Sequence, residues 1–288
     1  MGFSMRTGLL LSAAALLLFL AGCLAQPAGS TVLSGNIYWE GEVRVQGEVV
    51  IGKDAVLTIA PGSRILFMPY LEENPDRQRK PHELRGSKLL VHGKIIARGT
   101  ASEPIVFSHV DPDAPPGSWG GIKVQDAEQA YFYNCAFRQA MNALHSCRSW
   151  IAVEYCRFEH NQVGLLFHNA EMLIERNLLR HNGTAIFYLS GAPVICENRI
   201  VDNDNGLVIA DASGAYRIEN NSFFDNRFYN VGLGERVRHS VDLRNNYWGT
   251  SDSKTLEGKL FDGRSSLWKG EINYLPLRSA PVRISGLE

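Results

Sequence analysis

The sequence predicts an all-β, single-domain protein, a right-handed parallel β-helix (solenoid) of about ten turns with capped ends. Two observations carry this prediction. Six segments between 130 and 250 repeat one pattern: an apolar residue, then Cys or Asn three positions later, then an apolar residue two positions after that. Each repeat also consists of short alternating stretches broken by Asn and Gly, without helical periodicity. Repeats of this length and pattern are typical of stacked β-helix turns.

The repeated segments are FYNCAF, VEYCRF, IERNLL, ICENRI, IENNSF and LRNNYW. Their middle residues form a predicted structural ladder with spacings of 21, 21, 21, 23 and 25: Cys135, Cys156, Asn177, Asn198, Asn221 and Asn246. A second set follows five positions later: Asn161, Asn182, Asn203 and Asn226. Stacking in register places like residues over like, so the flanking apolar columns fill a core. We expect the ladder asparagines to adopt left-handed turn conformations and to hydrogen-bond to one another.

The cysteines do not define a disulfide framework, because five cysteines in 288 residues are too few and no CxxC pair occurs. Cys135 and Cys156 occupy the same column in adjacent turns. Their positions allow either a disulfide or two small buried thiols, and we favour the thiols.

Residues 1–22 have the layout of a lipoprotein signal peptide, with Arg6 followed by an apolar run. The string LAGC resembles a bacterial lipobox, which makes Cys23 the lipidated first residue, followed by a tether over 23–30. Leu24, and not Asp, follows Cys23, and resemblance to the enterobacterial sorting rule then favours the outer membrane over the inner membrane. The alternatives are an ordinary signal cleaved near Ala25 and an uncleaved anchor. A lipid anchor would hold the protein at the membrane without a membrane-binding surface.

Three segments follow the tether. Residues 31–125 are predicted to form an N-terminal cap and the first turns, with an inserted polar loop near 68–86. Residues 126–250 hold the regular repeats, and 251–288 form an irregular closing segment. Closed ends are expected because an open turn offers its strand edges to other chains.

The strings GEVVIGKDAVLTIAPGSRILF, LLVHGKIIARGTASEPIVF, PGSWGGIKV and NNYWGT resemble bacterial right-handed parallel β-helix repeat proteins of the lipoprotein type, within the pectate-lyase-like superfamily. The resemblance covers about 30–276 and implies the fold. Most members of this subset have no assigned activity. Pectin hydrolases of the superfamily use Gly-His-Gly and Arg-x-Lys motifs, and neither motif occurs here.

One column of polar residues is the candidate site, four positions after each ladder residue: Gln139, His160, His181, Asp202 and Asp225. Two imidazoles and a carboxylate about 5 Å apart can share a proton or bind a transition metal, whereas a solvated corner would need no function. The string DNDNG from Asp202 resembles part of a calcium loop but lacks its remaining ligands. We expect no metal and no cofactor. The catalytic candidates are Asp202, Asp204, Asp225, His160 and His181.

Two neighbouring columns are charged. Arg138, Glu159 and Arg180 are predicted to pair on the surface, worth about 0–1 kcal/mol a pair. Glu154, Glu175 and Glu219 are predicted to lie on an exposed strand face. Aromatic side chains that could stack on sugar rings, about half of them expected in the core, are Trp150, Phe167, Tyr188, Tyr216, Phe228 and Tyr229.

The net charge of −1 argues against a nucleic-acid partner, because no basic field is present. The sequence therefore favours a noncatalytic lipoprotein of the bacterial cell envelope, at the outer membrane and facing either the periplasm or the surface. Its coil would bind a polysaccharide or serve as a scaffold for an envelope protein. The alternative is a polysaccharide lyase or glycoside hydrolase that uses acidic residues on the coil.

Overall fold

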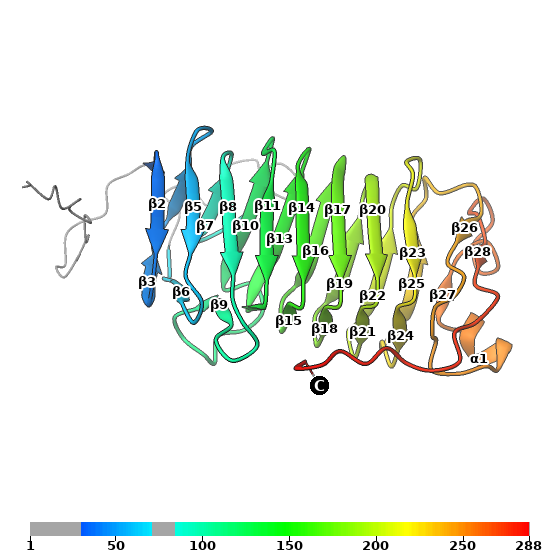
Figure 1. Cartoon of the computed structure of the whole chain (residues 1–288). Coiled ribbons are helices and arrows are strands. Elements are labelled where there is room, and N and C mark those ends of the chain that lie inside the picture. The colour runs from blue at the N-terminus through cyan, green and yellow to red at the C-terminus, as the bar shows by residue number, and fades with distance from the viewer. Residues whose placement is uncertain (1–29, 71–83, 288) are drawn as a thin grey trace, which may run out of the picture.

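The computed structural model describes residues 30–70 and 84–287. The predicted signal peptide, Cys23, the tether up to residue 29 and the central part of the inserted loop lie outside the described residues. The described chain winds into a parallel β-solenoid of about nine turns, against the predicted ten, with three strands in each complete turn (Figure 1). The all-β, single-domain prediction is confirmed.

Three parallel sheets run along the coil, and we name them first, second and third in chain order. The first sheet contains β1 (Thr31–Leu33), β4 (Glu48–Ile51), β7 (Lys88–Val91), β10 (Trp119–Gln125), β13 (Ala140–Cys147), β16 (Val163–His168), β19 (Thr184–Tyr188), β22 (Asn205–Ile209), β25 (Tyr229–Leu233) and β27 (Leu260–Phe261). The second contains β2 (Asn36–Trp39), β5 (Val56–Ile59), β8 (Lys94–Arg98), β11 (Ala130–Tyr133), β14 (Trp150–Glu154), β17 (Ala170–Glu175), β20 (Gly191–Cys196) and β23 (Arg217–Glu219). The third contains β3 (Glu42–Val45), β6 (Arg64–Phe67), β9 (Ile105–His109), β12 (Cys135–Arg138), β15 (Arg157–Glu159), β18 (Leu178–Arg180), β21 (Arg199–Val201) and β24 (Ser222–Phe224).

The core lies inside the three sheets and is built by like residues stacked in register. Phe137 pairs with Phe107 in the turn before it and with Phe158 in the turn after it. Their rings are parallel, with centroids 4.9 and 4.7 Å apart. All three side chains are fully buried, so the repeat period converts directly into a continuous aromatic column.

Both asparagine ladders form inside the coil. The amide nitrogen Nδ2 of Asn182, for example, donates to Asn203 Oδ1 at 2.9 Å and to the carbonyl of Phe158 at 2.8 Å. The left-handed conformation, however, falls one residue before each ladder position, so that part of the prediction is wrong. Arg176 and Glu197 have φ of 55° and 57°. The ladder residue itself turns inward and satisfies buried backbone groups, which leaves the preceding residue to make the sharp turn.

Cys135 and Cys156 are free thiols in the structure. They continue the first ladder, because the backbone N–H of Cys135 donates to Cys156 Sγ at 3.4 Å. The thiol of Cys156 in turn donates to the carbonyl of Glu154 at 3.2 Å. Burial raises the pKa of the Cys135 thiol well above its ordinary value, and the neighbouring Cys156 raises it further.

The C-terminal segment closes one end of the coil and then returns along its side. It contains α1 (Ser253–Glu257) and pairs β26 (Val241–Asp242) with β28 (Ile272–Asn273). The last residues run back beneath the third sheet (Figure 1). There Val282 and Ile284 pack against Leu178 and Val201 in a small apolar cluster. Among the described residues, no helix is long and apolar enough to cross a membrane.

Candidate functional site

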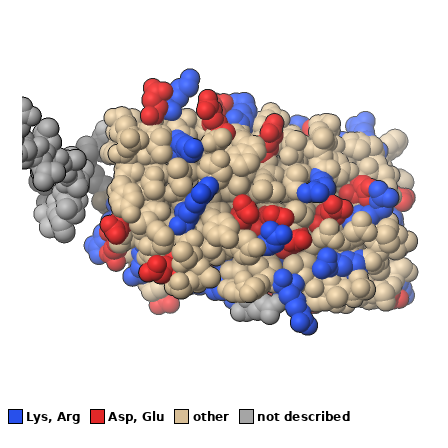
Figure 2. Space-filling view, in the orientation of Figure 1, with Lys and Arg blue, Asp and Glu red and all other residues tan. Residues whose placement is uncertain are grey.

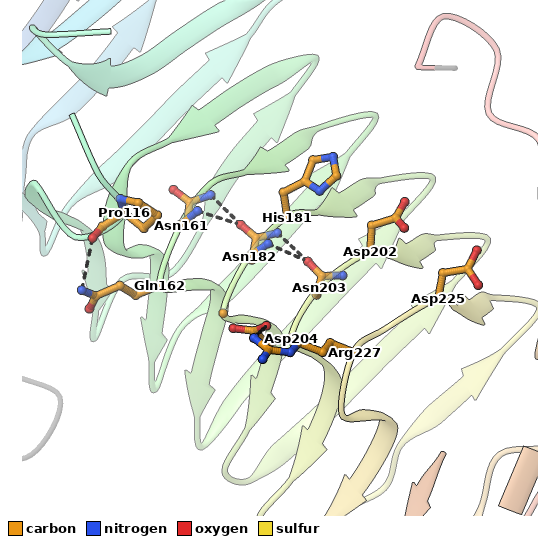
Figure 3. A pocket seen from close by; sticks show the side chains of 11 residues that line it. Pro116, Asn161, Gln162, His181, Asn182, Asp202, Asn203, Asp204, Asp225 and Arg227 are labelled. Atoms are coloured by element: carbon orange, nitrogen blue, oxygen red, sulfur yellow. Dashed lines mark hydrogen bonds and ion pairs between the residues drawn. The ribbon is translucent and has the colours of Figure 1, made fainter. Parts of the chain in front are cut away.

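The candidate site is a shallow groove of about 640 Å³ on the corner where the third sheet turns into the first. Its lining residues come from four successive turns and one loop (Figure 3). They are Pro116, Asn161, Gln162, His181, Asn182, Gly183, Asp202, Asn203, Asp204, Asp225 and Arg227.

The backbone at this corner explains why polar side chains face the groove. Each turn places one residue in the left-handed conformation and the next in the second ladder. His181, Asp202 and Asp225 have φ of 54° to 56° and are exposed, whereas Asn182 and Asn203 point inward and are buried. The three exposed side chains therefore line up along the coil at the spacing of the turns, about 4.8 Å.

A loop over 110–118, between β9 and β10, supplies one wall of the groove. The side-chain amide nitrogen Nε2 of Gln139 holds this loop by donating to the carbonyls of Asp111 and Pro112 at 3.0 and 2.7 Å. At the rim, Gln162 Nε2 donates to the carbonyl of Pro116 at 3.2 Å. The wall is thus fixed to the same column of corner residues that forms the floor.

Four of the five predicted catalytic candidates line the groove: His181, Asp202, Asp204 and Asp225. The fifth, His160, is not part of the lining. Its ring stacks on that of His181, with centroids 5.3 Å apart. Burial lowers the pKa of His160, and the charge of His181 lowers it further. A catalytic role for these residues stays a prediction.

Sequence analysis missed Gln162 and Pro116 as lining residues. Gln162 directly follows a ladder asparagine, so its place at the corner could have been read from the repeat. Pro116 lies in the string DPDAPPGS, which interrupts the repeat and is recognisable as a loop. Nothing in the sequence shows that this loop folds onto the corner column.

The groove offers no metal-binding cluster. Within 30–70 and 84–287, no three His, Cys, Asp or Glu side chains gather closely enough to hold a metal ion. The partial calcium loop at Asp202 is divided by the fold, because Asn203 is buried in the ladder. Asp204 Oδ1 instead lies 3.6 Å from the guanidinium of Arg227.

The charged ladder next to the groove differs from the predicted surface pairing. Arg138 and Arg180 both reach Glu159, at 3.0 and 2.7 Å, but the Glu159 side chain is only 6% exposed. Burial alone would raise the pKa of Glu159. The hydrogen bond from Arg180 and the charges of both arginines outweigh burial, so the pKa is lowered. This is a buried carboxylate clamped by two arginines, and not a solvated pair.

The other polar faces are less organised. Figure 2 shows acidic and basic side chains intermingled over one face of the coil, with a larger uncharged area between them (Figure 2). On the second sheet, Glu154 pairs in register with Glu175, and both are half-buried, whereas the column predicted an exposed face. Of the aromatic residues, Phe167 and Tyr188 are fully buried, and Phe228 and Tyr229 are exposed by 50% and 36%.

Residues 107–247 match the family model described as a right handed beta helix region. Together with the parallel coil, this match supports the fold of a right-handed parallel β-helix. No curated protein and no solved structure matches the chain at a significant level.

Proposed function

We propose that the protein is a noncatalytic lipoprotein of the cell envelope whose corner groove binds a neutral polysaccharide. One observation carries the proposal: the groove is open along the coil and presents exposed polar side chains from successive turns. Such a surface suits a long ligand with repeated hydroxyl groups, because it offers a row of donors and acceptors and no enclosed apolar chamber.

The types of side chain support a saccharide. Asp202 and Asp225 are exposed acceptors, and the amide of Gln162, whose Nε2 donates one hydrogen to Pro116, has an oxygen that can accept and a second N–H that can donate. The exposed ring of Phe228 directly follows Arg227 of the groove and lies 4.8 Å from its guanidinium. An aromatic ring at the rim is a suitable platform for the apolar face of a sugar.

The charge of the groove favours a neutral ligand over an acidic one. Its lining contains three aspartates and one arginine, and the arginine is already paired with Asp204. The two remaining carboxylates, Asp202 and Asp225, would repel a uronic-acid polymer. The same charge pattern disfavours nucleic acid as a partner.

A hydrolytic enzyme is the second candidate, because Asp202 and Asp225 occupy the same groove in successive turns. Glycosidases use two carboxylic groups on either side of the scissile bond. Their acid is kept protonated by a buried, apolar surrounding. Both aspartates here are exposed, so the groove supports binding better than it supports acid catalysis.

A panel of neutral and acidic polysaccharides tests the groove. We expect retention of the protein on a neutral polymer, and a loss of affinity of at least about tenfold in Asp202→Ala/Gln162→Ala, since two hydrogen-bonding groups are removed. Glu154→Gln on the second sheet is the control and should bind as the wild type does. If the double variant binds with the same affinity as the wild type, the groove is not the binding site. If the wild type releases reducing or unsaturated ends and Asp202→Ala does not, the protein is an enzyme instead.

The lipid anchor is tested separately. In a bacterial host, we expect the mature protein to carry acyl chains on Cys23, to fractionate with membranes and to lose both properties in Cys23→Ser. Intact mass and cell fractionation measure this. A wild-type chain whose mass fits cleavage near Ala25, without acyl groups, would contradict the anchor and leave the groove proposal unaffected.

A further inference from the structure

A second polar cluster lies at a different corner, where the first sheet turns into the second. Cys147 ends β13, and His168, which ends β16, is its partner in register one turn later. Arg148 and Asn169 are the residues that follow them, and both have a left-handed φ of 49°. None of these residues lines the groove.

Two nitrogen atoms face the sulfur of Cys147. Arg148 Nη1 donates to Sγ at 3.3 Å, and His168 Nδ1 lies 4.0 Å from Sγ. Arg148 is held in place by Asp126, because its Nε and Nη2 donate to the two carboxylate oxygens at 2.6 and 2.8 Å. This bidentate pair leaves Nη1 as the guanidinium nitrogen directed at the sulfur.

The neighbouring hydrogen bonds decide which nitrogen of His168 carries the proton. Ser190 Oγ donates to Asn169 Oδ1 at 2.7 Å, so the amide oxygen of Asn169 faces Ser190. Its Nδ2 then faces His168 Nε2 at 3.3 Å. An amide nitrogen can only donate, so Nε2 is the acceptor and the proton of the neutral imidazole sits on Nδ1, facing the sulfur.

Both groups that face the sulfur are therefore donors, and one of them is a cation. Nitrogen donors or cations beside the sulfur are the typical surroundings of nucleophilic cysteines. Asp126 opposes this effect, but its charge is engaged by Arg148. Another titratable group near Asp126 is His92, whose Nδ1 lies 3.2 Å from the carbonyl of Gln125.

We propose that Cys147 is a reactive thiol, activated by Arg148 and His168, that forms mixed disulfides with small disulfide molecules. The Cys147 thiolate attacks one sulfur of the disulfide and forms a new S–S bond. The original S–S bond breaks, and the second sulfur leaves as a thiolate with the bonding electron pair. The protein gains one half of the disulfide as a reversible modification of this corner.

The chain contains its own control for this proposal. Cys196 is about as buried as Cys147, at 6% against 9% exposed. Its Sγ, however, faces a carboxylate and donates to Glu175 Oε1 at 3.5 Å. Burial, followed by the charge of Glu175, raises the pKa of Cys196 to about 11. Equal burial with opposite surroundings predicts opposite reactivity.

The first test uses the folded full-length protein and an aryl disulfide, dithiobis-nitrobenzoate, at pH 7. Release of the coloured aryl thiolate gives the rate, and peptide mass mapping gives the labelled cysteine. We expect Cys147 to be modified at least about tenfold faster than Cys196, because nitrogen donors face its sulfur whereas a carboxylate faces the sulfur of Cys196. Modification of Cys196 at an equal or higher rate would overturn the proposal.

Variants test the activating groups. We expect His168→Gln and Arg148→Met to slow modification of Cys147 by about fivefold or more, because each removes a group that faces the sulfur. Arg148→Lys should restore part of the rate. Arg176→Met is the matched control, because Arg176 has a similar left-handed φ of 55° but lies at another corner. If His168→Gln and Arg148→Met fold normally and leave the rate unchanged, the proposal is wrong.

Discussion

We expect Asn198→Ala to lower the free energy of unfolding by about 3 kcal/mol. Asn198 is completely buried. Its Nδ2 donates to the carbonyls of Ile174 and Cys196 at 2.8 and 2.9 Å. It also donates to Asn221 Oδ1, while Asn198 Oδ1 accepts from the backbone N–H of Asn177. Alanine leaves these buried groups without partners and opens a cavity between two turns.

Denaturant unfolding followed by circular dichroism measures this loss. Asn36→Ala is the control, because Asn36 is exposed on β2, and we expect it to change the free energy by less than about 0.5 kcal/mol. If the ladder asparagines did not support the turns, both variants would change the free energy of unfolding by the same small amount. That result would contradict the assignment of the ladder as an inner support of the coil.

The second large effect is expected at Glu159. Glu159→Gln should lower the free energy of unfolding by about 2 kcal/mol at pH 7, because it removes a buried charge that receives hydrogen bonds from Arg138 and Arg180. The two arginines are about half exposed and stay hydrated, which limits the loss. Glu128→Gln, at an exposed position, is the matched control and should be close to neutral.

The difference in stability between the wild type and Glu159→Gln is expected to depend on pH. Since the pKa of Glu159 is lowered in the folded protein, its ionised form is more stable there than in the unfolded chain. Its contribution to stability is therefore present above the ordinary glutamate pKa of about 4.3 and is lost as the pH falls toward the lower folded value. The difference in stability between wild type and Glu159→Gln should shrink over that interval. A difference that stays constant down to pH 3 would contradict the clamp.

Much of the coil could be predicted from the sequence, because stacking turns the repeat period into spatial neighbourhood. The pairing of Arg138, Glu159 and Arg180 follows directly from a spacing of 21 residues. The burial of Glu159 does not follow, because it depends on how the long arginine side chains fold over the carboxylate. The same period also places Cys147 opposite His168, and that pair was missed because neither residue lies in a column that repeats.

The non-repeating segments could not be placed from the sequence. Periodicity identifies 110–118 as an interruption, but the groove wall exists because Gln139 binds the carbonyls of that loop. The C-terminal segment was predicted only as an irregular closure. Its return under the third sheet depends on the apolar contact of Val282 and Ile284 with Leu178, between residues about a hundred positions apart. Such long-range contacts have no local signal.

The position of a bound oligosaccharide tests the central claim most directly. A crystal structure of the protein with a fragment of the neutral polymer that it retains should show sugar rings along the corner groove. We expect contacts with Gln162 and Asp202 and at least one ring near Phe228. Sugar rings on the outer face of the second sheet, with the groove filled only by water, would contradict the account.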